Sequence, residues 1–132
     1  MTANRTEVRL DHDAEAVAAA RDAVRDRLAG LLPSDRVDEA VLITDELVTN
    51  AIRHATAERD GRIGLRFEIT TTTVRIVVTD GSARFEWAGR DRPGDAAGGF
   101  GLVLVDEIAD RWGLSLDGKK AVWFEMDVRT TG

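Results

Sequence analysis

The chain has 132 residues and 43% apolar content, which suit one globular domain. Its net charge of −6 argues against nonspecific nucleic-acid binding, which needs a basic face. With no cysteine and only two histidines, the sequence excludes disulfides, thiolate metal sites and histidine-rich metal sites. No segment approaches the about 18 to 20 apolar residues of a membrane span, and the N-terminus lacks a signal peptide's apolar stretch, so we expect one cytoplasmic domain over residues 1–132.

The first part of the chain predicts a short strand followed by two helices. Glu7–Leu10 is the expected strand, and a helical period of apolar residues predicts a helix over Asp13–Leu28. Gly30 and Pro33 supply the signals that end this helix. A second helix is expected over Ser34–His54, with Ser34 as its N-cap and acidic residues in its first turn, where the helix dipole favours them.

Two β-hairpins are expected in the second part, because the apolar residues recur there at a period of two. Arg62–Ile69 and Val74–Thr79 predict an antiparallel hairpin with one buried face. Trp112–Leu116 and Val122–Val128 predict a second hairpin around an Asp117-Gly118 turn.

A long irregular segment separates these hairpins. Residues 81–99 are rich in Gly, Asp, Arg and Ala and have no periodicity, which is typical of a lid, a binding loop or a disordered segment. A short helix is expected over Leu102–Ala109. The element order predicts an α+β fold, a two-layer sandwich with helices on one face of a mostly antiparallel, mixed sheet.

Glu46 and Asn50 are the first candidate functional residues. They stand four positions apart, on one face of the second helix and beside its apolar stripe. Such a pair often occupies the solvated edge of an amphipathic helix. A carboxylate beside an apolar stripe, however, needs a partner, a metal or a substrate to offset its desolvation, so the pair by itself leaves both interpretations open.

Two further features lie downstream. Asp80 ends an apolar strand, where its carboxylate is able to accept a hydrogen bond from an amino group, although strand-ending Asp-Gly turns are common. The segment GGFGL at 98–102 opens a helix; its glycines let the backbone approach a ligand, and the helix start offers N–H groups to an anion. A plain loop before a helix has the same pattern, and neither a Rossmann fingerprint nor a Walker P-loop is present.

Together, the order and spacing of these features resemble one family. ELVTNAIRHA at 46–55, VVTDG at 77–81 and GFGL at 99–102 are similar to the N-box and the two glycine boxes of the GHKL ATPase/kinase superfamily, which includes gyrase B and histidine kinases and has the Bergerat ATP-binding fold. IADRWG, followed by AVWFEM, is similar to its small bacterial branch of anti-sigma-factor serine/threonine kinases. The resemblance covers about residues 7 to 128.

The resemblance implies ATP and Mg²⁺ as cofactors and gives the motif residues roles. Asn50 would hold the Mg²⁺ that bridges the ATP phosphates, and Glu46 would act as general base towards an incoming hydroxyl. Asp80 would read the adenine amino group, Ser82 would permit close approach to the base, and Arg53 would lie near phosphate. The second glycine box would cradle the phosphates with Gly98, Gly99, Phe100, Gly101 and Leu102. Residues 84–98 would form a lid.

One motif departs from the family pattern: Asp80-Gly81-Ser82-Ala83-Arg84 stands where Asp-x-Gly-x-Gly is usual. Two hypotheses follow. The chain is a kinase that phosphorylates a STAS-type anti-sigma-factor antagonist and sequesters a sigma factor, or it is a module, with or without ATP, that acts by occlusion alone. The intact Glu46/Asn50 pair favours the kinase, and the altered glycine box favours the module. A ligand-free structural domain would require all three motifs to align by chance.

The resemblance also bears on partners and size. A histidine kinase needs a dimerisation segment and a gyrase-like machine needs a transducer domain, and 132 residues hold neither. We therefore expect a free-standing domain that acts on a sigma factor and its antagonist, with neither nucleic acid nor membrane as a direct partner. Relatives of this branch are often dimers, so a homodimer is compatible with it.

Overall fold

The computed structural model describes residues 4–10, 14–55, 63–79, 100–115 and 121–128. Five strands and three helices lie in these ranges. In chain order they are β1 (Asn4–Leu10), α1 (Ala14–Leu28), α2 (Ser34–Ala55), β2 (Ile63–Ile69), β3 (Thr73–Thr79), α3 (Phe100–Ile108), β4 (Arg111–Ser115) and β5 (Ala121–Asp127).

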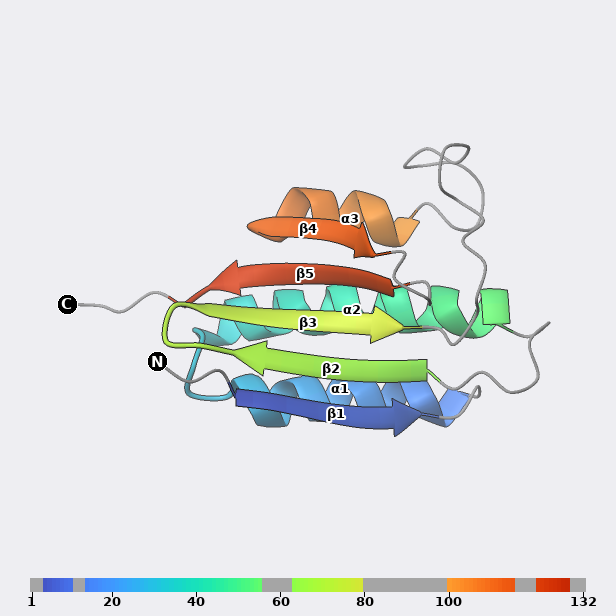
Figure 1. Cartoon of the computed structure of the whole chain (residues 1–132), viewed down its shortest axis with the longest axis horizontal. Coiled ribbons are helices and arrows are strands. Elements are labelled where there is room, and N and C mark those ends of the chain that lie inside the picture. Colours follow the sequence, from blue (N-terminus) through green and yellow to red (C-terminus); the bar gives the residue numbers. More distant parts are fainter. Residues whose placement is uncertain (1–3, 11–13, 56–62, 80–99, 116–120, 129–132) are drawn as a thin grey trace.

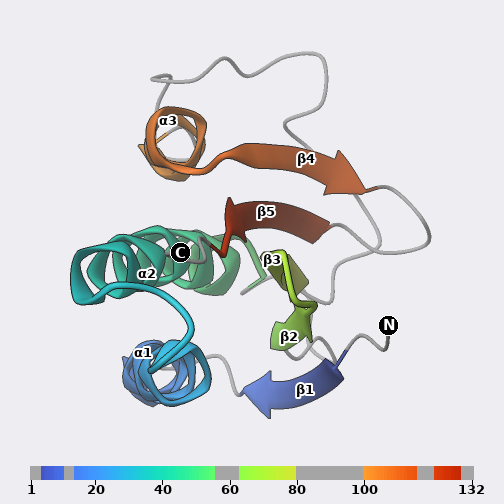
Figure 2. The ribbon, with the colours of Figure 1, turned by 90° about the vertical axis from the view of Figure 1, so that its left-hand side faces the viewer.

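The strands form one sheet in the order β1-β2-β3-β5-β4, and every pair of neighbouring strands is antiparallel. All three helices lie on one face of this sheet, with α2 across its middle (Figures 1 and 2). The predicted α+β sandwich with helices on one face is therefore confirmed. The prediction of a mixed sheet is wrong for the described strands, because both hairpins are antiparallel and the edge strand β1 also pairs antiparallel with β2.

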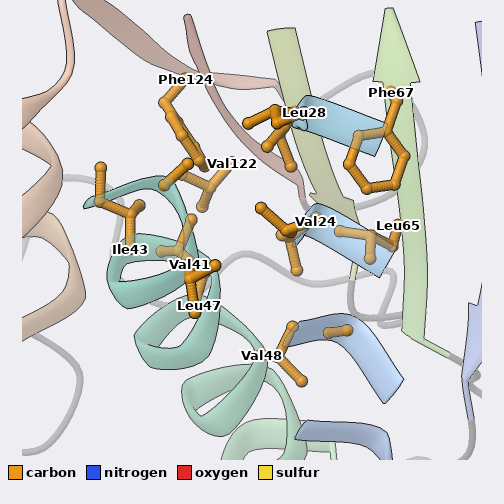
Figure 3. Packing of buried hydrophobic residues seen from close by; sticks show 14 of the residues in the cluster. Val24, Leu28, Val41, Ile43, Leu47, Val48, Leu65, Phe67, Val122 and Phe124 are labelled. Carbon is orange, nitrogen blue, oxygen red and sulfur yellow. The ribbon is translucent and has the colours of Figure 1, made fainter. Parts of the chain in front are cut away.

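The core lies between the helices and the sheet. The period-two residues Ile63, Leu65 and Phe67 of β2 are fully buried on the helix side, as the alternation predicts. Val24 and Leu28 of α1 lie between these strand residues and α2 (Figure 3). Each such side chain contributes roughly 1.5–3 kcal/mol through removal from water, so this layer holds the helices on the sheet.

The turn between α1 and α2 confirms one predicted signal and corrects another. Gly30 has a φ of 84°, a left-handed conformation that glycine adopts without strain, and α1 ends before it as predicted. The N-cap prediction for Ser34 is wrong. The carbonyl of Pro33 accepts the first bonds of α2, from the amides of Arg36 and Val37, both at 2.9 Å, so Ser34 is already in the first turn.

Two element boundaries differ from the prediction because pairing and packing, rather than periodicity, set them. β1 starts at Asn4 and pairs with β2 along its whole length, from Asn4 opposite Ile69 to Leu10 opposite Ile63. Its few apolar residues give a weak alternation signal, so only its end was predicted. α3 starts at Phe100, two residues before the predicted start.

Candidate functional site

The described parts of the predicted motifs lie towards one end of the molecule. The second half of α2, the end of β3 at Thr79 and the start of α3 at Phe100 lie towards the same end (Figure 1). Arg36, near the start of α2, contacts Ile108, the last residue of α3, and Asp110, which follows α3. The two helices therefore run in opposite directions. The start of α3 therefore lies towards the half of α2 that carries Glu46 and Asn50.

Asn50 lies on the flank of α2 that faces α3. Positions seven apart in a helix share nearly the same side, which places Asn50 on the side of Ile43 and Arg36, and Arg36 reaches α3 directly. Asn50 is only 6% exposed. Its side-chain nitrogen Nδ2 is buried and has no hydrogen-bond partner in the part of the chain that the structure describes.

An unpartnered buried amide is costly, at about 1–3 kcal/mol, and most buried polar groups in proteins have partners. Asn50 therefore carries a cost that a ligand's polar groups would remove. Thr44 is the other buried side chain without a partner among the described residues. It is fully enclosed, at 0% exposure, and sequence analysis did not single it out, because a threonine within an apolar helix face carries no distinctive signal.

Glu46 stands one turn before Asn50 and is half-buried. Within the described part of the chain, its carboxylate forms neither an ion pair nor a hydrogen bond. Its neighbour Asp45 differs, since it accepts a 2.9 Å bond from Arg21 of α1. Asp38, two turns earlier on that flank, accepts a 3.0 Å bond from Arg25. The flank of α2 towards α1 is thus satisfied by ion pairs, whereas Glu46 has no such partner among the described residues.

The start of α3 suits an anion. Its first turn contains no acidic residue, so the unpaired N–H groups and the positive end of the helix dipole face no fixed negative charge from that turn. Phe100, Gly101 and Leu102 form this first turn. Backbone amides here would be the phosphate-binding groups of the second glycine box.

The donor set fits a metal that arrives with a nucleotide. No group of three or more His, Cys, Asp or Glu side chains is placed to hold a metal ion in the part of the chain that the structure describes. A single neutral amide oxygen, as on Asn50, suits Mg²⁺ when phosphates and waters complete its coordination. The site therefore fits Mg²⁺ bound through phosphates rather than a metal centre built from protein alone.

Several predicted site residues lie outside the described residues. These are Asp80, Ser82, Gly98, Gly99 and the predicted lid over 84–98. The side chains of Arg53, Phe100 and Leu102 are likewise not described, although these residues lie in helices. The geometry above thus rests on Glu46, Asn50 and the backbone at the start of α3. No described helix has a stretch long and apolar enough to cross a membrane.

Comparisons with known proteins identify the family to which this chain is similar. A family model, the histidine kinase-like ATPase domain, matches residues 10–126. The chain is 30% identical over 89 residues to the serine-protein kinase RsbW of Staphylococcus aureus, in strains bovine RF122 / ET3-1 and MRSA252, which covers 58% of this chain and 56% of each relative. It therefore spans about half the length of the curated relatives it matches.

A solved structure has a similar fold. The crystal structure of the RsbU and RsbW domains of Rv1364c from Mycobacterium tuberculosis matches with a TM-score of 0.68 at 20% identity. The match covers 96% of this chain and 33% of that one. At this identity the likeness concerns the fold alone, which extends over nearly all of the sheet and helices described above.

Proposed function

The chain belongs to the histidine kinase-like ATPase domain family, and from this premise we propose that it is an ATP-binding anti-sigma regulatory factor. In this proposal it phosphorylates a serine or threonine of a STAS-type anti-sigma-factor antagonist and, when free of the antagonist, sequesters a sigma factor in the cytoplasm. The observation that carries the proposal is Asn50, which is buried at the flank facing α3. Among the described residues its amide nitrogen has no partner, and Glu46, one turn away, has none either. The RsbW relatives support the choice of branch.

In this proposal, each of the described site residues has a separate role in phosphoryl transfer. Asn50 would hold Mg²⁺ through its side-chain oxygen, and the amides at the start of α3 would bind the phosphates. Glu46 would accept the proton of the attacking hydroxyl as the new phosphorus–oxygen bond forms and the bond to ADP breaks. Mg·ATP supplies the phosphoryl group and the neutralising charge. Since the transition state of such transfers needs positioning above all, a rigid helix is a suitable carrier for both side chains.

The remaining motif residues complete the proposed site. Asp80 would bind the adenine amino group, with Ser82 beside the base and Arg53 near the phosphates. Gly98 and Gly99 would let the backbone approach the phosphates ahead of α3, and residues 84–98 would cover the bound nucleotide. The altered first glycine box favours a second candidate, a module of the same fold that occludes its partner without phosphorylating it.

The test uses labelled Mg·ATP and candidate antagonist proteins with wild type, Glu46→Gln and Asp45→Asn. Both variants remove one carboxylate charge from neighbouring positions, but Asp45 lies on the α1 flank and pairs with Arg21. We expect Glu46→Gln to bind ATP normally and to lose phosphotransfer by about 10²- to 10⁴-fold, the usual contribution of a general base. Asp45→Asn should keep both activities.

Other outcomes would overturn parts of this proposal. ATP binding by wild type without transfer to any antagonist would favour the occluding module. Unchanged transfer in Glu46→Gln would remove Glu46 as the base, and unchanged Mg²⁺-dependent ATP binding in Asn50→Ala would remove Asn50 as the metal ligand. A wild-type chain that binds no ATP would contradict the kinase and leave the occluding module that acts without the nucleotide.

A further inference from the structure

Arg36 caps the C-terminal end of α3, which lies far from the candidate site. Its guanidinium donates to the carbonyl oxygen of Ile108 at 3.3 Å and to the carboxylate of Asp110 at 3.0 Å. It also donates to Glu39 on its own helix at 2.6 Å. The last carbonyls of a helix have no partners within it, and positive charge is favoured at this end of the dipole. Because the last turn of α3 has no basic residue of its own, Arg36 supplies that charge from another helix.

Asp110, which pairs with Arg36, also forms hydrogen bonds to strand β5 of the sheet. The carboxylate oxygen that accepts from Arg36 also accepts from the backbone amide of Asp127 at 2.8 Å. The amide of Asp110 donates to the carbonyl of Glu125 at 3.0 Å. Asp110 therefore ties the start of α2 and the end of α3 to β5. Both side chains are largely shielded from water, with 22% of Arg36 and 28% of Asp110 exposed.

These contacts hold one end of a short helix. α3 has only 9 residues, about 13 Å of helix, and a helix that short is marginal without tertiary contacts. Its middle is held by the buried Val105 and by a 2.9 Å bond from the indole of Trp112 to Asp106. A shift at the anchored end would move a rigid rod of this length along its axis and displace the amides at its start.

We propose that Arg36 and Asp110 are positioning residues for the nucleotide site. They fix the axial position of α3, so that its first amides meet the phosphates held beside Asn50. Arg36 and Asn50 lie on the same flank of α2, fourteen positions apart, so one helix carries both the metal ligand and the anchor. This inference rests on the function proposed above.

The experiment compares Mg·ATP with adenosine, which lacks the phosphates, on the full chain. Dissociation constants are measured for wild type, Arg36→Met, Asp110→Asn and the control Arg25→Met, which breaks the 3.0 Å pair with Asp38 on the α1 flank. We expect both anchor variants to weaken ATP about tenfold and to leave adenosine unchanged, while the control changes neither. Asp110→Asn keeps an acceptor for the Asp127 amide and is the milder variant if Arg36→Met fails to fold.

Amide hydrogen exchange along α3 supplies the second readout. Faster exchange there in the anchor variants, together with an altered ratio of ATP to adenosine affinity, is the expected result. An unchanged ratio, or an equal weakening of both ligands, would overturn the positioning role and leave a purely structural ion pair. Failure of the wild type to bind ATP would instead overturn the proposed function itself, and this inference with it.

Discussion

The two faces of the sheet differ in how their polar side chains are satisfied. On the open face, Glu125 pairs with Arg75 and with Arg111, both at 2.7 Å. In the helix layer that covers the other face, the buried Thr44 Oγ1 and Asn50 Nδ2 have no hydrogen-bond partner among the described residues. Pairing on the open face is achieved between neighbouring strands and needs no ligand. An unpartnered group in the covered layer is either a cost that the core tolerates or a place where a ligand completes the bonds.

Exposure and location separate these two possibilities. Thr44 is enclosed among apolar neighbours at 0% exposure, whereas Asn50 retains 6% and lies on the flank facing α3. Two unpartnered polar atoms, six residues apart on one helix, therefore lead to different interpretations. Gly113→Ala and Glu125→Gln on the open face should lower stability, whereas Asn50→Leu and Thr44→Val in the helix layer should raise it.

The largest effect is expected on the open face at Gly113. A Cβ at this position would lie 2.7 Å from Trp123 Cζ2 and 2.8 Å from Cε2, and the guanidinium of Arg75 lies 4.4 Å from the centre of the same ring. Gly113→Ala must displace the ring and its cation–π partner, so we expect a loss of about 2–3 kcal/mol in the free energy of unfolding, measured by urea denaturation.

Gly64→Ala is the matched control on the same face. Its Cβ would meet Glu7 at 3.6 Å and Thr79 at 3.7 Å, which are ordinary contacts, so the change should stay within about 0.5 kcal/mol. Equal losses in both variants would mean that the loss comes from glycine replacement in strands and not from the packing of Trp123.

The next effect is a gain of stability at the candidate site. Asn50→Leu keeps the side-chain size and removes the unpartnered amide, so the ligand-free chain should gain about 1–2 kcal/mol in unfolding free energy. Mg·ATP should stabilise the wild type and no longer stabilise the variant, as a thermal melt with and without nucleotide would show. If the substitution lowers the ligand-free stability, Asn50 has a structural partner in solution and the site assignment weakens.

A smaller gain is expected at Thr44. Thr44→Val replaces a buried, unpartnered hydroxyl with a methyl group of similar size and should add about 1 kcal/mol without changing ATP affinity. Thr44→Ser keeps the hydroxyl but removes a buried methyl, and should lower stability by a similar amount. Should Thr44→Val reduce ATP affinity, Thr44 belongs to the site after all and the contrast with Asn50 fails.

Local patterns were sufficient to predict most of the fold. The alternation of Ile63, Leu65 and Phe67 identified the buried face of β2, and Gly30 marked the end of α1, because burial in a two-layer sheet and a left-handed turn each leave a signal within a few residues. The N-cap of α2 was misplaced because the carbonyl of Pro33, which has no recognisable side-chain signal, accepts the first helical bonds.

The candidate site was predictable only in part. The spacing of Glu46 and Asn50 put them on one helical face, but which flank faces α3 depends on packing between distant segments. The contact between Arg36 and Asp110 spans 74 positions. Nothing in the local sequence of either residue distinguishes it from an ordinary solvated charge, so such an anchor emerges only from the folded structure.

The smallest expected effect is an acid-dependent one on the open face. Burial raises the pKa of the Glu125 carboxyl, but hydrogen bonds from Arg111 and Arg75 outweigh it and hold the pKa below the ordinary value of 4.5. Since the pKa is lower in the folded chain, the stabilisation is complete above about pH 4.5 and is lost as the pH falls through the folded value. Both arginines are partly exposed, so screening keeps the contribution below about 1 kcal/mol.

The measurement compares melting temperatures of wild type, Glu125→Gln and Thr44→Val between pH 3 and 7. The deficit of Glu125→Gln should be constant above about pH 5 and shrink below 4.5, whereas the gain of Thr44→Val should not depend on pH, since no charge changes there. A deficit of Glu125→Gln that persists at pH 3 would show that the amide loses packing or hydrogen bonds rather than charge pairing. In that case Glu125 stabilises the open face through packing or hydrogen bonds that do not depend on its charge.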